Sequence, residues 1–180
     1  MKNTRKGTWL IYTGILLIAA ALIVQIVSHQ NDAIKTAWAR QTISAMESSN
    51  KGQLSDTPYM GVLQIPALDL QLPVFSTYSQ QGMEQAPCLY MNDLGHMILC
   101  AHNADCHFGR IGTLRFGDRI IIDTSRFRYE YRVEKIEILR PDEVERMTDT
   151  SYALTLFTCT PYGQARITVR ACMCQSSERI

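Results

Sequence analysis

The chain has 180 residues and a formal net charge of +1. This length allows one compact domain with an appendage. The near-neutral charge argues against a nucleic-acid binder, which would carry an excess of Lys and Arg. The function must therefore be found in local patterns of residues rather than in the overall charge.

The N-terminal part of the chain carries an apolar run from Trp9 to Val27, and about 20 such residues let a helix cross a bilayer. Basic residues precede the run and none follows it directly. The positive-inside rule therefore leaves residues 1–7 in the cytoplasm and exports the rest of the chain. We predict an uncleaved transmembrane anchor over residues 8–27. A cleaved signal peptide is the alternative, with Ala19 and Ala21 as its small residues, but the apolar run continues beyond them.

A polar segment follows the anchor over residues 28–57. Apolar residues such as Ala33, Ala37 and Trp38 recur in it at helical spacings, which predicts a helical stalk leading away from the membrane. The stalk is expected to end in a linker over residues 49–56. The rest of the chain, residues 58–180, is predicted to form an extracellular domain.

This domain shows short strand-like segments separated by turn signals, the pattern of a closed β-barrel or a sandwich. The segment 76–89 is the least regular, and we predict a loop there with a helical turn near residues 80–85. A short helix is expected to start at Pro141. The predicted strands cover residues 61–66, 68–74, 97–101, 119–123, 127–139, 154–159 and 166–171.

One thiol stands where two of these strands meet. Residues 154–159 have the composition of a strand, and Pro161 and Gly163 end it because proline lacks an N–H and glycine accepts turn conformations. Apolar and polar residues then alternate from Arg166 onward. Such a hairpin sets Cys159 at a strand end with Arg166 beside it, and a nearby guanidinium favours the nucleophilic thiolate.

A second polar site follows another apolar run. Residues 97–101 are uninterruptedly apolar and end at His102 and Asn103, as in a buried strand whose last residues emerge at a rim. Functional residues often lie at such strand ends, where a rigid strand delivers them to a loop.

These residues carry a resemblance. Residues 155–159 read Thr-Leu-Phe-Thr-Cys, similar to the Thr-Leu-x-Thr-Cys signature of the sortases, the cysteine transpeptidases of Gram-positive cell surfaces. Arg166, at the head of a β-branched run, resembles the second half of that signature. The catalytic histidine of sortases precedes a loop and a Leu-x-x-Gly-Asp turn, as His102 precedes residues 114–118 here. The Gly-x-Leu-x-Ile-Pro run from Gly61 also resembles the opening of a sortase domain.

The resemblance covers about residues 60–171 and implies a mainly β fold, a closed sortase-type barrel with short helices. It implies that Cys159 forms a thioester with the substrate, that His102 acts as general acid and then base, and that Arg166 hydrogen-bonds the oxyanion or the substrate backbone. His107 is the second choice for the histidine. The predicted substrate contacts are Thr158, Ala101 and Asn103.

Sortases cut a Leu-Pro-x-Thr-Gly-like sorting signal of exported proteins and pass the acyl group to an amine of a peptidoglycan precursor or a pilin. The resemblance implies these partners here, with no cofactor. Residues 160–163 are similar to pilin-polymerising sortases. However, that group usually adds a C-terminal membrane span and an N-terminal Asp-Pro-aromatic lid, which this sequence lacks. We therefore favour a single-anchor enzyme that attaches proteins to the wall, or an accessory one, and leave the class open.

Other functions are compatible with the same residues. A hydrolytic cysteine peptidase would resolve the thioester with water, and a catalytically idle, wall-associated binding module would form none. A buried structural cysteine is the plainest alternative for Cys159.

The other cysteines suggest neither metal nor disulfides. Four possible zinc ligands fall close together, Cys100, His102, Cys106 and His107. Their spacing matches none of the usual zinc frameworks, so we predict no metal site. Exported domains often form disulfides, but the nucleophile must stay free, and Cys172 and Cys174 are badly placed to bridge each other. We expect mostly reduced thiols.

Overall fold

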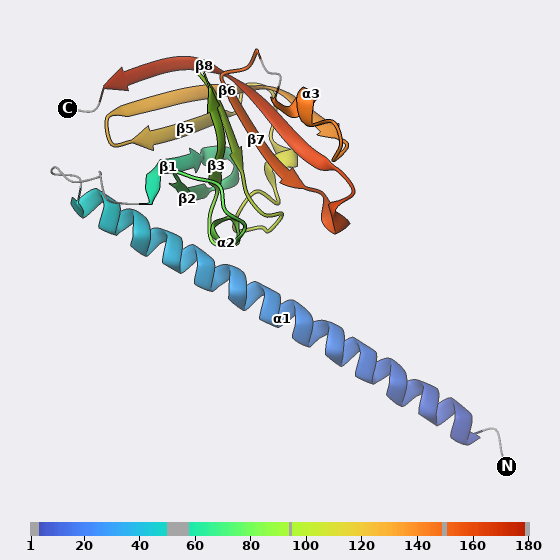
Figure 1. Ribbon diagram of the computed structural model, residues 1–180. Helices are drawn as coiled ribbons and strands as arrows, with labels where there is room; N and C mark the ends of the chain where they lie inside the picture. The colour runs from blue at the N-terminus through green and yellow to red at the C-terminus, as the bar shows by residue number, and fades with distance from the viewer. Residues whose placement is uncertain (1–3, 50–57, 94, 149–150, 179–180) are drawn as a thin grey trace.

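The structure is a computed structural model that describes residues 4–49, 58–93, 95–148 and 151–178. One long helix, α1 (Thr4–Ser49), carries a β-barrel against its C-terminal part (Figure 1). The barrel confirms the predicted mainly β fold with short helices.

Within the described residues, the strands close a barrel in the order β1-β2-β3-β4-β7-β8-β6-β5. The pairs β2–β3 and β4–β7 are parallel, and the other neighbouring pairs are antiparallel. The strands are β1 (Tyr59–Ile65), β2 (Leu70–Phe75), β3 (Cys88–Asp93), β4 (His96–Cys100), β5 (Arg119–Thr124), β6 (Phe127–Leu139), β7 (Leu154–Cys159) and β8 (Arg166–Glu178). The short helices are α2 (Gln80–Met83) and α3 (Val144–Thr148), with 3-10 turns η2 (Pro66–Leu68), η3 (Ile111–Thr113) and η4 (Pro161–Gly163).

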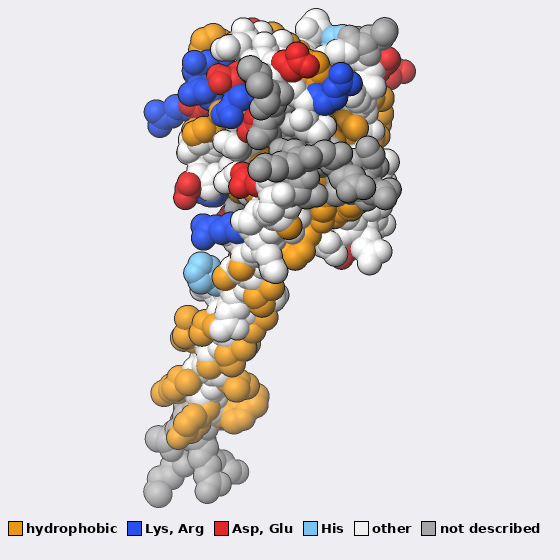
Figure 2. Space-filling model, turned by 90° about the vertical axis from the view of Figure 1, so that its left-hand side faces the viewer, with side chains coloured by type: hydrophobic (Ala, Val, Ile, Leu, Met, Phe, Trp, Pro, Cys, Tyr) orange, Lys and Arg blue, Asp and Glu red, His pale blue; other side chains and the backbone are white. Residues whose placement is uncertain are grey.

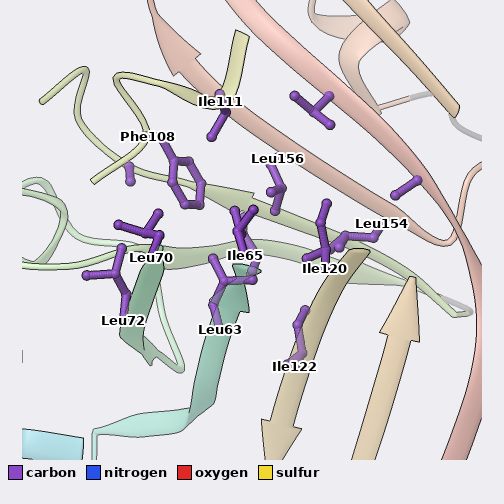
Figure 3. Packing of buried hydrophobic residues seen from close by; sticks show 14 of the residues in the cluster. Leu63, Ile65, Leu70, Leu72, Phe108, Ile111, Ile120, Ile122, Leu154 and Leu156 are labelled. Atoms are coloured by element: carbon purple, nitrogen blue, oxygen red, sulfur yellow. The ribbon is translucent and has the colours of Figure 1, made fainter. Parts of the chain in front are cut away.

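The core lies inside the barrel, where inward-facing apolar side chains from several strands meet. Leu63 of β1, Ile120 of β5 and Leu156 of β7 are fully buried and point toward one another (Figure 3). Strand β1 also approaches β5 unusually closely. A Cβ on Gly61 would lie only 2.2 Å from the carbonyl oxygen of Asp123, so glycine is required there.

Helix α1 has two differently exposed parts. Its N-terminal part includes an exposed segment that is long and apolar enough to cross a membrane, and Figure 2 shows hydrophobic side chains along it. The helix then continues without a break and buries Ala39, Ile43 and Met46 against the barrel. The predicted stalk is therefore helical to Ser49, and it packs on the domain. Apart from Ser49, the predicted linker lies outside the described residues.

Most predicted strands are confirmed to within two residues, but the strand predicted over residues 166–171 continues to Glu178. Three further predictions are corrected. Residues 88–89, predicted as loop, begin β3, whose side chains are mostly exposed beyond Cys88 and so show no apolar alternation. The strand predicted from Leu68 begins at Leu70, because the preceding residues form η2. The helix predicted to start at Pro141 begins at Val144.

Candidate active site

Strand β7 delivers Cys159 to the rim of the barrel. The five residues before it in the strand are buried, whereas Cys159 is exposed. Leu154 and Leu156 pack in the core, and side chains alternate along a strand, so Phe157 and Cys159 share the outer face of the barrel. Pro161 then prevents the strand from continuing. The thiol is thus accessible and rigidly held.

The hairpin of β7 and β8 places Arg166 directly opposite Cys159 in the strand register. Hydrogen bonds close the connecting loop. The amide of Thr160 donates to the carbonyl of Ala165 over 2.8 Å, and the amide of Ala165 donates to the Thr160 hydroxyl over 2.9 Å. Opposite residues of antiparallel strands project to the same face, so the guanidinium and the thiol lie on one side of the sheet.

The Arg166 side chain is supported on both sides. Its Cζ lies 5.7 Å from the centre of the Phe157 ring, which is a cation–π distance. Its Nη1 lies 3.7 Å from the sulfur of Met147 in α3. The sequence patterns did not single out Met147, because nothing in them shows that α3 covers this part of the sheet.

A buried arginine, Arg170, holds α3 in that place. It is 2% exposed, and it donates to the carbonyls of Arg146 (2.6 Å) and Met147 (2.9 Å) and to the Thr155 hydroxyl (2.9 Å). It also forms an ion pair with Glu137 over 3.0 Å. Its charge is therefore paired and its donors are satisfied, as a buried ion requires. Burial opposes ionisation of Glu137, yet hydrogen bonds from its basic neighbours lower the pKa of that carboxyl.

His102 reaches the site from the strand beside β7. Strand β4 runs parallel to β7 with Cys100 opposite Phe157, and the amide of Ala101 donates to the carbonyl of Phe157 over 3.3 Å. Continuing this register by two residues sets His102 level with Cys159, at the same end of the barrel. The His102 side chain is exposed.

The loop after His102 folds back on that residue. The amides of Ala104 and Phe108 donate to the His102 carbonyl over 3.0 and 3.2 Å. A Cβ on Gly109 would lie 2.8 Å from the carbonyl oxygen of Ala104, so this tight fold needs glycine. Phe108 anchors the loop in the core. The position of His102 is therefore determined by a compact loop as well as by β4.

His107, the second choice for the histidine, is buried at 1% exposure. Its Nε2 lies 2.9 Å from the Gln85 carbonyl, an acceptor, so Nε2 carries the proton. Burial, reinforced by the charge of Lys35, lowers its pKa to about 4. A neutral, buried imidazole cannot meet a substrate, and the geometry therefore favours His102.

The three predicted substrate contacts differ in position. Thr158 and Ala101 are buried, and the Thr158 hydroxyl donates to the Ala101 carbonyl over 2.8 Å. The Thr158 side chain thus joins the end of β7 to the backbone that follows β4, and neither side chain faces solvent. Contact of Thr158 and Ala101 with substrate stays a prediction. Asn103 is half-buried in the loop, and its contact with substrate stays a prediction.

The fold and these residues match a known family, since a model of the sortase domain matches residues 63–174. The chain belongs to the sortase family. It is similar to sortase D of Bacillus subtilis (strain 168), 27% identical over 110 residues, and to sortase A of Bacillus anthracis, 29% identical over 108 residues. These matches cover 57% and 56% of this chain but 55% and 51% of those proteins, so the chain spans about half the length of the curated relatives it matches.

Solved sortase structures share the fold. Sortase A of Listeria monocytogenes matches with a TM-score of 0.64 and 21% identity, over 69% of this chain and 92% of that one. The pilus-related sortase C of Group B Streptococcus matches with a TM-score of 0.61 and 23% identity, over 68% of this chain and 70% of that one. Sortases D, E and F also match, so the class is not resolved.

Among the cysteines of this sortase, Cys159 has the most suitable surroundings. All six are free thiols. Burial raises the pKa of Cys100 to about 12, and burial together with a hydrogen bond to Asp32 does the same for Cys106. Cys174 is exposed, but it lies near the far end of β8. No group of His, Cys, Asp and Glu within the described ranges is arranged to hold a metal ion.

An aromatic row leads to the outer face of β7, on which Cys159 lies, and the sequence patterns did not predict it. Tyr78 meets Tyr90 edge-on with ring centres 5.7 Å apart, and Tyr90 meets Phe157 in the same way at 5.4 Å. Tyr78 and Tyr90 are 49% and 39% exposed. The row therefore runs from the surface to the outer face of β7. Tyr90 belongs to β3, where the sequence patterns predict no strand.

Proposed function

We propose that this sortase is a membrane-anchored cysteine transpeptidase that cleaves a Leu-Pro-x-Thr-Gly-like sorting signal of exported proteins. One observation carries the proposal. Cys159 is exposed at the end of β7, opposite Arg166 in β8 and level with His102 after β4. Nucleophile, acid–base group and cation thus come from three adjacent strands, at one end of a rigid sheet.

In the proposed chemistry, Cys159 and His102 act in both half-reactions. The Cys159 sulfur attacks the carbonyl carbon of the Thr–Gly amide, and Arg166 hydrogen-bonds the developing oxyanion. The C–N bond breaks as His102 gives its proton to the leaving amine, and a thioester remains. The incoming amine then gives a proton to His102 and attacks the thioester, and the C–S bond breaks to restore the thiolate.

The donor would be an extended peptide that lies against the exposed rings of Tyr78 and Tyr90, in the aromatic row that ends at the buried Phe157. The exposed ring faces supply apolar contact area for the leucine and proline of a sorting signal. The acceptor would be an amine of a peptidoglycan precursor or a pilin, as in other sortases.

The anchor proposal rests on α1. The apolar segment continues into the stalk as one uninterrupted helix, which passes through Ala19 and Ala21 without a break. We propose that it holds the enzyme in the cell membrane, with the N-terminus inside and the barrel outside. The domain boundaries at residues 7, 27 and 57 are part of this proposal.

The test uses the full chain in detergent micelles with a labelled sorting peptide and an amine. Cys159→Ala removes the nucleophile, and we expect transfer product to fall by roughly 10³-fold or more. Cys174→Ala is the matched control, since it removes the other exposed thiol, far along β8, and should keep full activity. Mass spectrometry would detect the thioester in the wild type and in Cys174→Ala, but not in Cys159→Ala.

The outcomes separate the alternatives. If Cys159→Ala and the wild type formed equal amounts of product, the proposed enzymatic function of Cys159 would be refuted. Peptide cleavage without transfer to any amine would identify a hydrolytic peptidase. Peptide binding without cleavage would identify an idle binding module.

A further inference from the structure

The turn after Cys159 contains a strained aromatic residue. Tyr162 occupies the third position of the turn Thr160–Gly163, with φ 71° and ψ 4°, and the amide of Gly163 donates to the Thr160 carbonyl over 2.8 Å. This position favours Gly or Asn, because the Cβ of other residues approaches a carbonyl oxygen. Among the described non-glycine residues only Asp69 shares a positive φ, of 51°, and a short polar side chain tolerates it better.

Packing within the molecule does not explain why a tyrosine stands there. Tyr162 is 96% exposed. The loop that bears it is nevertheless held firmly, because the Thr160 and Ala165 backbones are hydrogen-bonded to each other. The ring is therefore displayed to solvent from a tight hairpin end. Backbone strain of this kind tends to gather at functional sites, where it serves binding or catalysis.

The position of Tyr162 relative to the thiol indicates which substrate it would meet. The aromatic row of Tyr78, Tyr90 and Phe157 reaches β7 before Cys159, whereas Tyr162 lies beyond the strand end. In a transpeptidation the acyl part of the donor lies on one side of the thiol and the leaving amine on the other. The acceptor takes the place of the leaving amine, so it approaches from the side of Tyr162.

We propose that Tyr162 is a binding residue for the acyl acceptor, an inference that rests on the proposed transpeptidase function. A primary amine is mostly protonated at neutral pH, and the face of an aromatic ring attracts an ammonium group as well as its methylene chain. The ring collects the acceptor beside the thioester. The ammonium group first loses one proton to water, and the neutral amine then attacks the thioester as His102 accepts the second proton.

The test compares acceptor use by the full chain in micelles, with a labelled sorting peptide as donor and triglycine or Nα-acetyl-lysine amide as acceptor. Tyr162→Asn accepts the left-handed backbone without a ring. Its acceptor KM should rise about tenfold, with a matching fall in the ratio of transferred to hydrolysed product. Tyr162→Phe keeps the ring and should stay within about twofold of wild type. Asp69→Gly relieves strain elsewhere and should leave that ratio unchanged.

Several results would overturn the inference. One is an acceptor KM for Tyr162→Asn equal to that of wild type. Another is an equal loss of donor cleavage and transfer in this variant, which would show that the residue only shapes the loop. A wild-type protein that cleaves no donor would refute the proposed function itself, and the acceptor role with it.

Discussion

At the scale of single residues, burial distinguishes Cys100 and His107 from the proposed catalytic residues Cys159 and His102. Cys159 and His102 are exposed. Burial raises the pKa of Cys100 to about 12 and lowers that of His107 to about 4. Both shifts have one cause, because a low-dielectric interior disfavours the charged form of either group. The side chains of Cys100 and His107 are thus both neutral near pH 7.

The buried His107 predicts an acid-sensitive fold. Between pH 6.5 and about 4 the unfolded chain binds a proton that the folded chain does not. Stability is therefore full above pH 6.5 and is lost as the pH falls toward 4, by about 3 kcal/mol in total. Urea unfolding of wild type and His107→Gln at several pH values would measure this, because glutamine does not titrate.

His96→Gln is the matched control for that measurement. His96 is half-buried and pairs with the Tyr152 carbonyl at 2.9 Å, and its replacement should leave the acid-dependent loss in place. If the acid-dependent loss of stability persisted unchanged in His107→Gln, titratable groups other than His107 would be its cause.

At the scale of elements, the outer face of β8 connects the site to α3. Arg166 and Arg170 lie on this face, the first opposite Cys159 and the second beneath α3. Met147 links them, since its sulfur contacts Arg166 and its carbonyl accepts from Arg170. The conformation of the half-buried Arg166 thus depends on the buried Arg170.

We expect Arg170→Met to destabilise the protein by about 3 kcal/mol, because carbonyls of α3 and the Glu137 carboxylate lose their buried partner. Transpeptidation should also fall, since Met147 no longer holds Arg166. Thermal unfolding and peptide transfer, measured below the unfolding transition, would check both effects.

Arg132→Met controls for the substitution itself. Arg132 is exposed on β6, where it donates to the Gly117 carbonyl over 2.8 Å, and its loss should change stability by less than about 0.5 kcal/mol. Normal stability in Arg170→Met would show that α3 is held by other contacts.

At the scale of the whole molecule, α1 joins the proposed anchor to the barrel without a flexible joint. Asp32 accepts a hydrogen bond from Cys106 over 3.2 Å, and it lies five residues after Val27. At 1.5 Å per residue this is about 8 Å along the helix. An anchor in the bilayer would therefore keep the loop of His102 close to the membrane surface (Figure 1).

The stalk is expected to be part of the folded domain. Ala39 is 2% exposed, so Ala39→Glu would bury an unpaired carboxylate and cost about 3 kcal/mol. The thermal midpoint should fall by roughly 6–12 °C. Ala37→Glu, on the exposed side of the same helix, should change it by less than about 2 °C. Equal midpoints for the two variants would show that the stalk packs only loosely.

Local patterns are enough to predict the features that depend on residues close together in the chain. Apolar length indicates the long helix, and alternation with turn residues indicates most strands and the hairpin of Cys159 and Arg166. Such signals are local, because the strand period and the turn preferences act over a few positions. Strand β3 has a mostly exposed surface and lacks that alternation, so the sequence patterns predict no strand there.

Which strands are neighbours follows from long-range contacts and not from local patterns. Alternation shows which face a side chain occupies, but not which strand lies beside it. The pairing of β4 with β7 joins segments 57 residues apart, as the Thr158–Ala101 hydrogen bond shows. This pairing brings His102 level with Cys159 and buries the side chains of Thr158 and Ala101. The buried Arg170 depends likewise on α3 folding across β8, a long-range contact that no local pattern encodes.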